Sequence, residues 1–483
     1  MEEITEYLLN KSRKKLDGAL NTIAKRIVDK ECSLFVGSGM SLNSNLPSWH
    51  QLLTPCADEL EIPIHPYSDL FSLAQYYANC KSDSELRRIV NDQIDLLAKS
   101  TPLHDKLVMA GFKSIWTTNY DMLIEDSLRN DHIAFNTIIS DSDLAKVSYE
   151  GRINVYKING DTNNRNAMVL TQRDIESYTK THQLFLTFLK KELVSNTFLF
   201  VGYSFTDRII LNCLCEIREY LNFPISNTTI HYAIMVVNGS EDQNSIYFAE
   251  DLKLRYGIEC IFIKKEELSN TIELLWKKIQ TGKVFISGSY NTLSDEEEHF
   301  ADALSEHIVR DLYENKYRIS TGIGKRLGAF ITGYANQYLI TKGMTNISKF
   351  LSMRPFPFHL NLDENKKATY RMIMQHDCYA AIFMFGRSET TTKEGSCETT
   401  GHYSYGVYQE FEIAKESGRI IIPIGSTGYE AKVIWNEVKN NINEYPYLSK
   451  KIDALGYEKD PERLSKIILS ILDNNTKHHS INQ

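Results

Sequence analysis

The feature that most constrains the fold is an alternation of short apolar runs with longer helical patterns, which begins twice along the 483 residues. In the first half, runs rich in β-branched and aromatic residues predict strands at residues 33–36, 114–117, 154–157, 197–201, 232–237 and 259–263. Helical periodicity separates most of them, for example at residues 69–77 and 184–193. Another helix is predicted before the first strand, at residues 20–28, and one after the last strand, at residues 268–279. Because the chain returns through a helix before most strands, this order favours parallel pairing.

The same alternation restarts after residue 281. Strands are predicted at residues 284–286, 318–320, near 350, 380–385 and 420–424, and helices at 295–313, 329–340 and 461–472. Chains longer than about 250–300 residues usually divide into domains. We therefore predict an α/β protein of two Rossmann-like domains, residues 1–281 and 282–483, each a mostly parallel sheet with helices on both faces.

Composition narrows the class of protein. Hydrophobic residues make up 42% and charged residues 24% of the chain, as in ordinary globular proteins. The net charge of −8 and the lack of a strongly basic domain argue against a nucleic-acid partner. No apolar run approaches ~18 residues, and no signal-peptide pattern opens the chain. The eight cysteines form no C-x-x-C pair, so we expect free thiols, no metal site and a cytoplasmic location.

A glycine-rich turn follows the first predicted strand, in the segment Gly37-Ser38-Gly39-Met40-Ser41. Glycines at such a turn let backbone N–H groups face a pyrophosphate without a Cβ in the way. The third glycine of the usual dinucleotide fingerprint is absent, since Leu42 stands in its place. A phosphate cradle and a purely structural turn are both compatible with this segment.

Three further strands of the first half end in small or polar residues. They are followed by Thr118-Asn119-Tyr120-Asp121, Asn159-Gly160-Asp161 and Gly202-Tyr203-Ser204-Phe205-Thr206-Asp207. Each segment could simply cap the next helix. The carboxyl ends of parallel strands meet at one edge of the sheet, where doubly wound folds bind ligands. Four such strand ends therefore favour one shared nucleotide pocket.

The order of these four blocks resembles the sirtuin-like family over roughly residues 20 to 280. The resemblance implies NAD⁺ as the ligand, and it assigns Gly37, Ser38, Gly39 and Ser41 to the diphosphate. It places Asn119 and Asp121 around the nicotinamide ribose, with Thr118 in the same pocket. It places Gly202 and Ser204 on the adenosine side.

Two departures from that family shape the expected chemistry. The paired C-x-x-C zinc module of deacetylating sirtuins is missing, which favours cleavage of NAD⁺ by water over deacylation. Asn159 stands where the family has its catalytic His, and an amide cannot take a proton near pH 7. We name Asn119 and Asn159 as the candidate catalytic positions. Either the chain is catalytically impaired or it manages without a base at residue 159.

The second half carries its own set of glycine turns and basic residues. It resembles the SLOG family, which is related to nucleotide-processing enzymes, but the P-G-G-x-G-T cradle of those enzymes is replaced by a loop at residues 387–405. Glu410 is the expected remnant of their acidic position, so the resemblance implies a ligand sensor. The candidate effector-binding residues are Ser287, Gly288, Ser289, Gly322, Gly324, Arg354, Arg371 and Glu410. Either arginine could bind phosphate or make an ion pair.

A sirtuin-like half followed by a SLOG half resembles the NAD-cleaving effectors of Thoeris antiphage systems. The resemblance implies an NAD⁺ hydrolase with NAD⁺ as substrate and no true cofactor. It further implies activation by a cyclic ADP-ribose isomer that a TIR-domain partner makes, and assembly into a homotetramer or a larger oligomer. The alternative from another class is a non-catalytic NAD-binding sensor or scaffold, which Asn159 favours somewhat.

Overall fold

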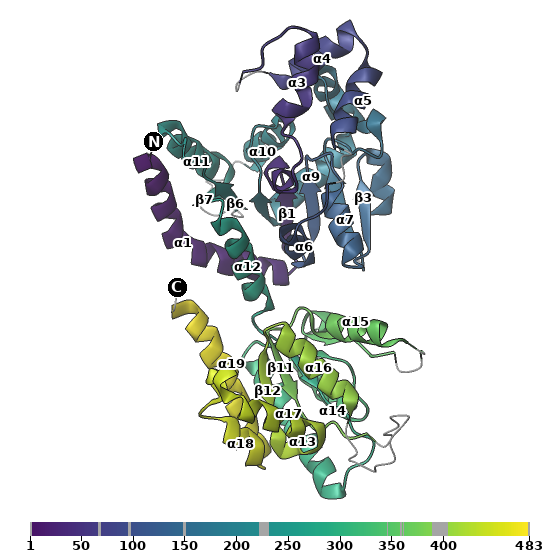
Figure 1. Cartoon of the computed structure of the whole chain (residues 1–483), viewed down its shortest axis with the longest axis vertical. Coiled ribbons are helices and arrows are strands. Elements are labelled where there is room, and N and C mark those ends of the chain that lie inside the picture. Colours follow the sequence, from purple (N-terminus) through teal and green to yellow (C-terminus); the bar gives the residue numbers. More distant parts are fainter. Residues whose placement is uncertain are drawn as a thin grey trace. The chain divides into compact units, whose positions relative to one another are not determined.

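The computed structural model describes residues 2–65, 69–94, 98–147, 151–221, 231–344, 346–357, 360, 362–388 and 404–481. The chain forms two compact units, Met1–Ile279 and Gln280–Gln483 (Figure 1). Their division falls at the end of helix α12 (Glu267–Gln280), close to the boundary predicted from the sequence. Each unit has its own sheet and its own hydrophobic core, and each is described by itself below.

The first unit is built on a seven-stranded sheet whose pairings are all parallel, in the order β3-β4-β2-β1-β5-β6-β7. The strands are β1 (Cys32–Val36), β2 (Ser114–Thr117), β3 (Phe135–Ile138), β4 (Ile153–Lys157), β5 (Thr197–Val201), β6 (His231–Val236) and β7 (Ile258–Ile263). The chain proceeds from β1 to β2 and β4 on one side, and to β5, β6 and β7 on the other. This reversal beside β1 is the topological switch point at which such sheets bind ligands.

Helices cover the first sheet on both faces. The helices of this unit are α1 (Glu2–Val28), α2 (Ser38–Ser41), α3 (Trp49–Glu59), α4 (Leu70–Cys80), α5 (Asp83–Ile94), α6 (Pro102–Met109), α7 (Leu123–Asn130), α8 (Gln172–Thr181), α9 (Gln183–Ser195), α10 (Arg208–Leu221), α11 (Gln243–Tyr256) and α12. All five residues of β1 are buried, and they alternate between two cores. Leu34 and Val36 join one core and Phe35 joins the other, as expected of a central parallel strand.

Helices α3, α4 and α5 form a separate small module with its own apolar cluster (Figure 1). Leu53 and Tyr77 lie at its centre, and Tyr120, from the loop after β2, packs into the same cluster. The module is therefore joined by apolar contacts to the loop that follows a central strand. Sequence analysis recognised α4 but not this arrangement.

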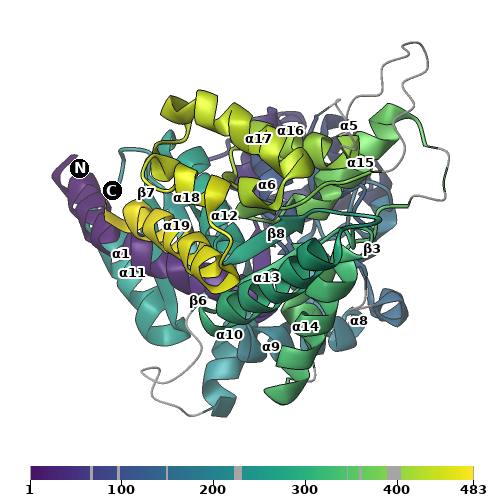
Figure 2. The ribbon, with the colours of Figure 1, turned by 90° about the horizontal axis from the view of Figure 1, so that it is seen from below.

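The second unit contains a five-stranded parallel sheet in the order β10-β9-β8-β11-β12. Its strands are β8 (Lys283–Ser287), β9 (Arg318–Thr321), β10 (Leu351–Met353), β11 (Ala380–Phe383) and β12 (Ile420–Pro423). Its helices are α13 (Asp295–Glu314), α14 (Leu327–Thr341), α15 (Glu364–Gln375), α16 (Tyr405–Glu416), α17 (Tyr429–Asn440), α18 (Ile452–Tyr457) and α19 (Pro461–Ile481). Figure 2 shows α13 between α14 and α19.

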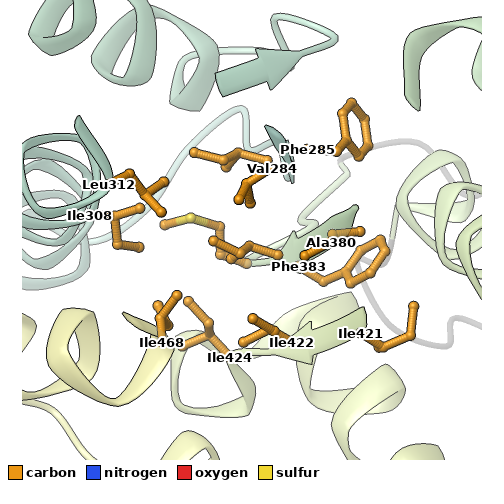
Figure 3. Close-up of a cluster of buried hydrophobic side chains, with 14 of the residues drawn as sticks. Val284, Phe285, Ile308, Leu312, Ala380, Phe383, Ile421, Ile422, Ile424 and Ile468 are labelled. Atoms are coloured by element: carbon orange, nitrogen blue, oxygen red, sulfur yellow. The ribbon is translucent and has the colours of Figure 1, made fainter. Parts of the chain in front are cut away.

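The core of this unit lies between the sheet and its helices. Ile308 of α13 and Ile468 of α19 lie in one buried cluster with Val284 of β8 and Ile422 of β12 (Figure 3). Burying a side chain of this size contributes roughly 1.5–3 kcal/mol. The amphipathic pattern that predicted α13 and α19 thus reflects their packing onto the sheet.

The fold class predicted from the sequence is confirmed, since both sheets are parallel and carry helices on both faces. Strand β3 was missed because three of its four residues are only half-buried at the sheet edge, so its sequence lacks a continuous apolar run. Most of the predicted loop 387–405 lies outside the described residues. Within the described part of the chain, each helix is too short or too polar to cross a bilayer.

Candidate functional sites

A cavity of about 150 Å³ lies in the first unit where β1, β2, β4 and β5 end. It brings together seven of the side chains predicted for the nucleotide pocket: Ser38, Ser41, Thr118, Asn119, Asp121, Asn159 and Ser204. These residues come from four different strand ends, as the parallel order predicted. Gly37, Gly39 and Gly202 do not line the cavity and lie in the turns beside it.

Close packing of two turns explains these glycines. A Cβ on Gly37 would collide with the carbonyl oxygen of Gly202, and the N–H of Gly39 donates to that same oxygen at 2.9 Å. Gly202 also has a φ of +66°, which a residue with a side chain rarely adopts. The glycines therefore let the turns after β1 and β5 touch beside the cavity that Ser38 and Ser41 line.

A hydrogen-bond chain fixes the amide of Asn119. Its Nδ2 donates to Ser41 Oγ at 2.9 Å and to the carbonyl of Gly37 at 3.1 Å. Ser41 Oγ in turn donates to Asp121 Oδ2 at 2.6 Å, and Asp121 Oδ1 accepts the N–H of Leu123 at 3.1 Å. Asn119 Oδ1 is buried and has no partner among the described residues. A buried acceptor without a partner is costly, so this oxygen is suited to accept a hydrogen bond from a ligand.

A buried ion pair lies beside the segment that carries Asn119 and Asp121. Lys157, from β4, donates to the carbonyl of Asp121, and its Nζ lies 3.3 Å from Glu125 Oε1, with both side chains fully buried. Burial raises the pKa of Glu125, while the nearby Lys157 charge opposes that rise. Sequence analysis missed the pair, because Glu125 lies within α7 and only the packing of α7 on β4 brings the charges together.

Asn159 lies beside a second carboxyl group, that of Asp207. Its Nδ2 lies 3.3 Å from the carbonyl of Thr118 and 3.5 Å from Asp207 Oδ2. Asp207 Oδ1 accepts the N–H of Ile209 at 2.8 Å, which caps the first turn of α10. Burial raises the pKa of Asp207, although the N–H of Ile209 and the amide of Asn159 oppose the rise. Sequence analysis quoted Asp207 within its motif but assigned it no role.

An aromatic wall from α3 and α4 closes another side of the cavity. Trp49 and Phe71 line it, with their ring centroids 5.8 Å apart, and Trp49 lies 5.8 Å from Tyr120. The indole N–H of Trp49 is buried and has no partner among the described residues. Flat apolar walls with a few polar groups are typical of small-molecule sites. Sequence analysis missed this wall because helical periodicity alone cannot say where an amphipathic helix docks.

The second unit contains a cavity of about 250 Å³ at the ends of β8, β9 and β11. Seven of the eight predicted effector residues line it: Ser287, Gly288, Ser289, Gly322, Gly324, Arg371 and Glu410. Arg354 does not. It forms a paired contact with Asp377, at 2.9 and 3.1 Å, and donates to the carbonyl of Ile373 at 2.7 Å. Of the two roles open to this arginine from the sequence, phosphate binding or an ion pair, Arg354 has the ion pair.

Arg371 lies in this cavity, and no carboxylate of the described residues forms an ion pair with it. Its Nε and Nη1 are buried with no partner in the described part of the chain, and its guanidinium lies 4.4 Å from the centre of the Phe356 ring. Burial lowers the pKa of Arg371, and the Glu410 carboxylate opposes that shift. Glu410 Oε2 accepts from Ser287 Oγ at 2.5 Å, and burial raises the pKa of Glu410 to about 7. Lys325 and Arg387 also line the cavity, which makes it suitable for an anion.

Comparison with protein families places each unit in a class. Residues 113–261 match the SIR2-like domain, and residues 267–475 match the Sir2- and TIR-associating SLOG family. The chain therefore joins a SIR2-like domain to a SLOG domain, which confirms the two resemblances found in the sequence.

Curated relatives extend along nearly the whole chain. An NAD(+) hydrolase ThsA from Cytobacillus dafuensis is 30% identical over 87% of this chain and 88% of its own length. Another, from Acinetobacter baumannii (strain 532279), is 29% identical over 93% of this chain and 97% of its own length. A solved Sir2 homolog–NAD complex covers 53% of this chain and 94% of its own, with 13% identity and a TM-score of 0.34. The chain belongs to the ThsA family of NAD(+) hydrolases.

Proposed function

We propose that the chain hydrolyses NAD⁺ to nicotinamide and ADP-ribose in the cavity of the first unit. The observation that carries the proposal is the fixed amide of Asn119, whose buried Oδ1 has no partner among the described residues. That oxygen is suited to hold a ribose hydroxyl or the attacking water. We take NAD⁺ as the substrate because the relatives are NAD(+) hydrolases by name.

The remaining polar residues would bind the rest of the dinucleotide. The turn from Gly37 to Ser41 and the side chain of Thr118 would contact the diphosphate and the ribose, and Gly202 and Ser204 would lie towards the adenosine. Nicotinamide is cationic in NAD⁺ and leaves as a neutral molecule, so its departure needs little acid. The protein must instead stabilise positive charge that develops on the ribose, which electrostatic groups can do.

We further propose that the cavity of the second unit binds a cyclic ADP-ribose isomer that activates hydrolysis. The buried guanidinium of Arg371 and the neighbouring Lys325 and Arg387 support an anionic ligand. The name of the matched SLOG family supports a TIR-domain protein as the source of the signal. We propose a homotetramer or larger assembly acting in the cytoplasm, where the free thiols of the described cysteines would stay reduced.

Nicotinamide release tests these proposals directly. The full chain is incubated with NAD⁺, with and without cyclic ADP-ribose isomers, and free nicotinamide is quantified by chromatography. We expect release that one isomer strongly accelerates. Binding of NAD⁺ without any release under either condition would instead support the non-catalytic sensor, the alternative that Asn159 favours.

The raised pKa of Glu410 predicts that activator binding depends on pH. A neutral Glu410 leaves the Arg371 charge available to phosphate, whereas an ionised Glu410 repels phosphate. Affinity should therefore fall as pH rises through about 7, the pKa of Glu410. Calorimetric titration of the full chain with the activator between pH 6 and 8 measures this affinity.

Glu430 provides a matched control for that titration. Burial also raises the pKa of Glu430 to about 7, but Glu430 does not line the cavity. Glu410→Gln should flatten the pH dependence of binding, and Glu430→Gln should preserve it. An unchanged pH dependence in the Glu410→Gln protein would contradict the prediction.

A further inference from the structure

Hydrolysis of NAD⁺ requires a group that takes a proton from the attacking water, and the amide of Asn159 cannot do so. Among the described residues that line the cavity, the two carboxyl groups belong to Asp121 and Asp207. Asp121 is occupied, because one oxygen accepts from Ser41 Oγ at 2.6 Å and the other from the N–H of Leu123. The contact of Asp207 Oδ2 with Asn159 is long, at 3.5 Å, which leaves this oxygen available.

We propose that Asp207 is the general base of the hydrolysis, an inference that rests on the proposed NAD⁺ cleavage. The bond between ribose C1′ and the nicotinamide nitrogen breaks, and its electron pair neutralises the leaving nicotinamide. The water oxygen forms the new bond to C1′ and passes one proton to Asp207 Oδ2, which releases it to solvent. Asn159 then lies beside this carboxyl group, with its Nδ2 3.5 Å from Oδ2, and is not a defective replacement for a base.

The loop that carries Asp207 is held in a definite conformation. Gly202 has a φ of +66° and Phe205 a φ of +57°, and the latter is unfavourable for an aromatic residue. Phe205 is nevertheless buried, with its ring 4.9 Å from those of Phe200 and Tyr203. This packing holds the loop, and the cap on α10 holds Oδ1, which fixes the Asp207 carboxyl group where Asp207 lines the cavity. Strained backbone of this kind is often found at functional sites.

The surroundings of Asp207 suit a base. The charge of Asp207 acts on four titratable side chains, Tyr120, Tyr178, Tyr203 and Cys213. Burial raises the pKa of each of them, so they stay neutral. Burial raises the pKa of Asp207, and no cation among the described residues lowers it. A carboxylate that binds a proton more readily than usual is a better base near neutral pH.

Asp207→Asn tests the assignment, because asparagine keeps the helix cap but cannot accept the proton. We expect nicotinamide release by the activated full chain to fall ~10²-fold or more, with KM for NAD⁺ little changed. The parent rate should fall as pH drops below the raised pKa of Asp207, since the ionised form is active, and Asp207→Asn should lose that limb. Asp207→Glu should recover part of the rate.

Asp242→Asn is the matched control. Asp242 caps α11 in the same unit by accepting the N–H of Ser245 at 3.2 Å, and it lies outside the cavity. The Asp242→Asn protein should retain full turnover. An Asp207→Asn protein that cleaves NAD⁺ at near the parent rate, or that retains the parent pH profile, would overturn the assignment of Asp207 as the base. It would leave the proposed NAD⁺ hydrolysis standing. A parent protein that releases no nicotinamide would overturn the proposed function and this inference together.

Discussion

Asn119→Ala is expected to lower NAD⁺ cleavage by ~10²–10³-fold, the effect of removing one fixed polar group from an enzyme site. The alanine protein loses the buried Oδ1 acceptor, and it frees Ser41 Oγ from the Nδ2 contact. Asn119 makes these contacts at a strand end and not within an apolar core, so the melting temperature should change by only a few degrees. Initial rates of nicotinamide release and thermal melts of the full chain measure both quantities.

Asn196→Ala is a suitable control for this experiment. Asn196 is also a buried amide of the first unit, and it donates to Ser33 Oγ at 3.2 Å and accepts from Lys113 Nζ at 3.1 Å. Asn196 directly precedes β5, so it lies at the amino-terminal ends of the strands, and the cavity lies at their carboxyl ends. Its loss should therefore affect stability and not turnover. Full activity in the Asn119→Ala protein would exclude Asn119 from the reaction.

Arg371→Ala is expected to weaken binding of the cyclic ADP-ribose isomer by about tenfold to more than a hundredfold. A charge-assisted hydrogen bond contributes about 1.5–3 kcal/mol, and each 1.4 kcal/mol corresponds to a factor of ten in affinity. Because a ligand shifts a conformational equilibrium only through its differential affinity, weaker binding should move activation to higher signal concentrations. NAD⁺ affinity measured without the signal should not change. Calorimetry and activation curves on the full chain report both effects.

Arg354→Ala distinguishes the two arginines that sequence analysis treated alike. Arg354 does not line the cavity and is paired with Asp377, which Lys283 also contacts at 2.7 Å. Its replacement should lower stability, because the half-buried carboxylate of Asp377 loses one of its two cations, but should leave signal affinity close to that of the parent. Equal signal binding by Arg371→Ala and the parent would place the sensor site elsewhere.

The sequence by itself determined the parallel architecture and the edge of the sheet where the site lies. Strands such as β1 and β5 are buried on both faces, so their sequences are continuous apolar runs that can be recognised locally. The residues that follow them, Ser38 and Asn119 among others, had to meet because parallel strands end at one edge. Local pattern and fold rules were sufficient for these positions.

Only the tertiary structure decided which polar groups are free and which are already paired. Arg354 and Arg371 have the same chemistry in sequence, but Asp377 reaches only the first. Asp207 and Asn159 lie far apart in the chain, and their contact depends on how the loops after β4 and β5 fold. Charge, burial and hydrogen-bond partners of a side chain depend on residues distant in sequence, so motif spacing could name the site but not assign its chemistry.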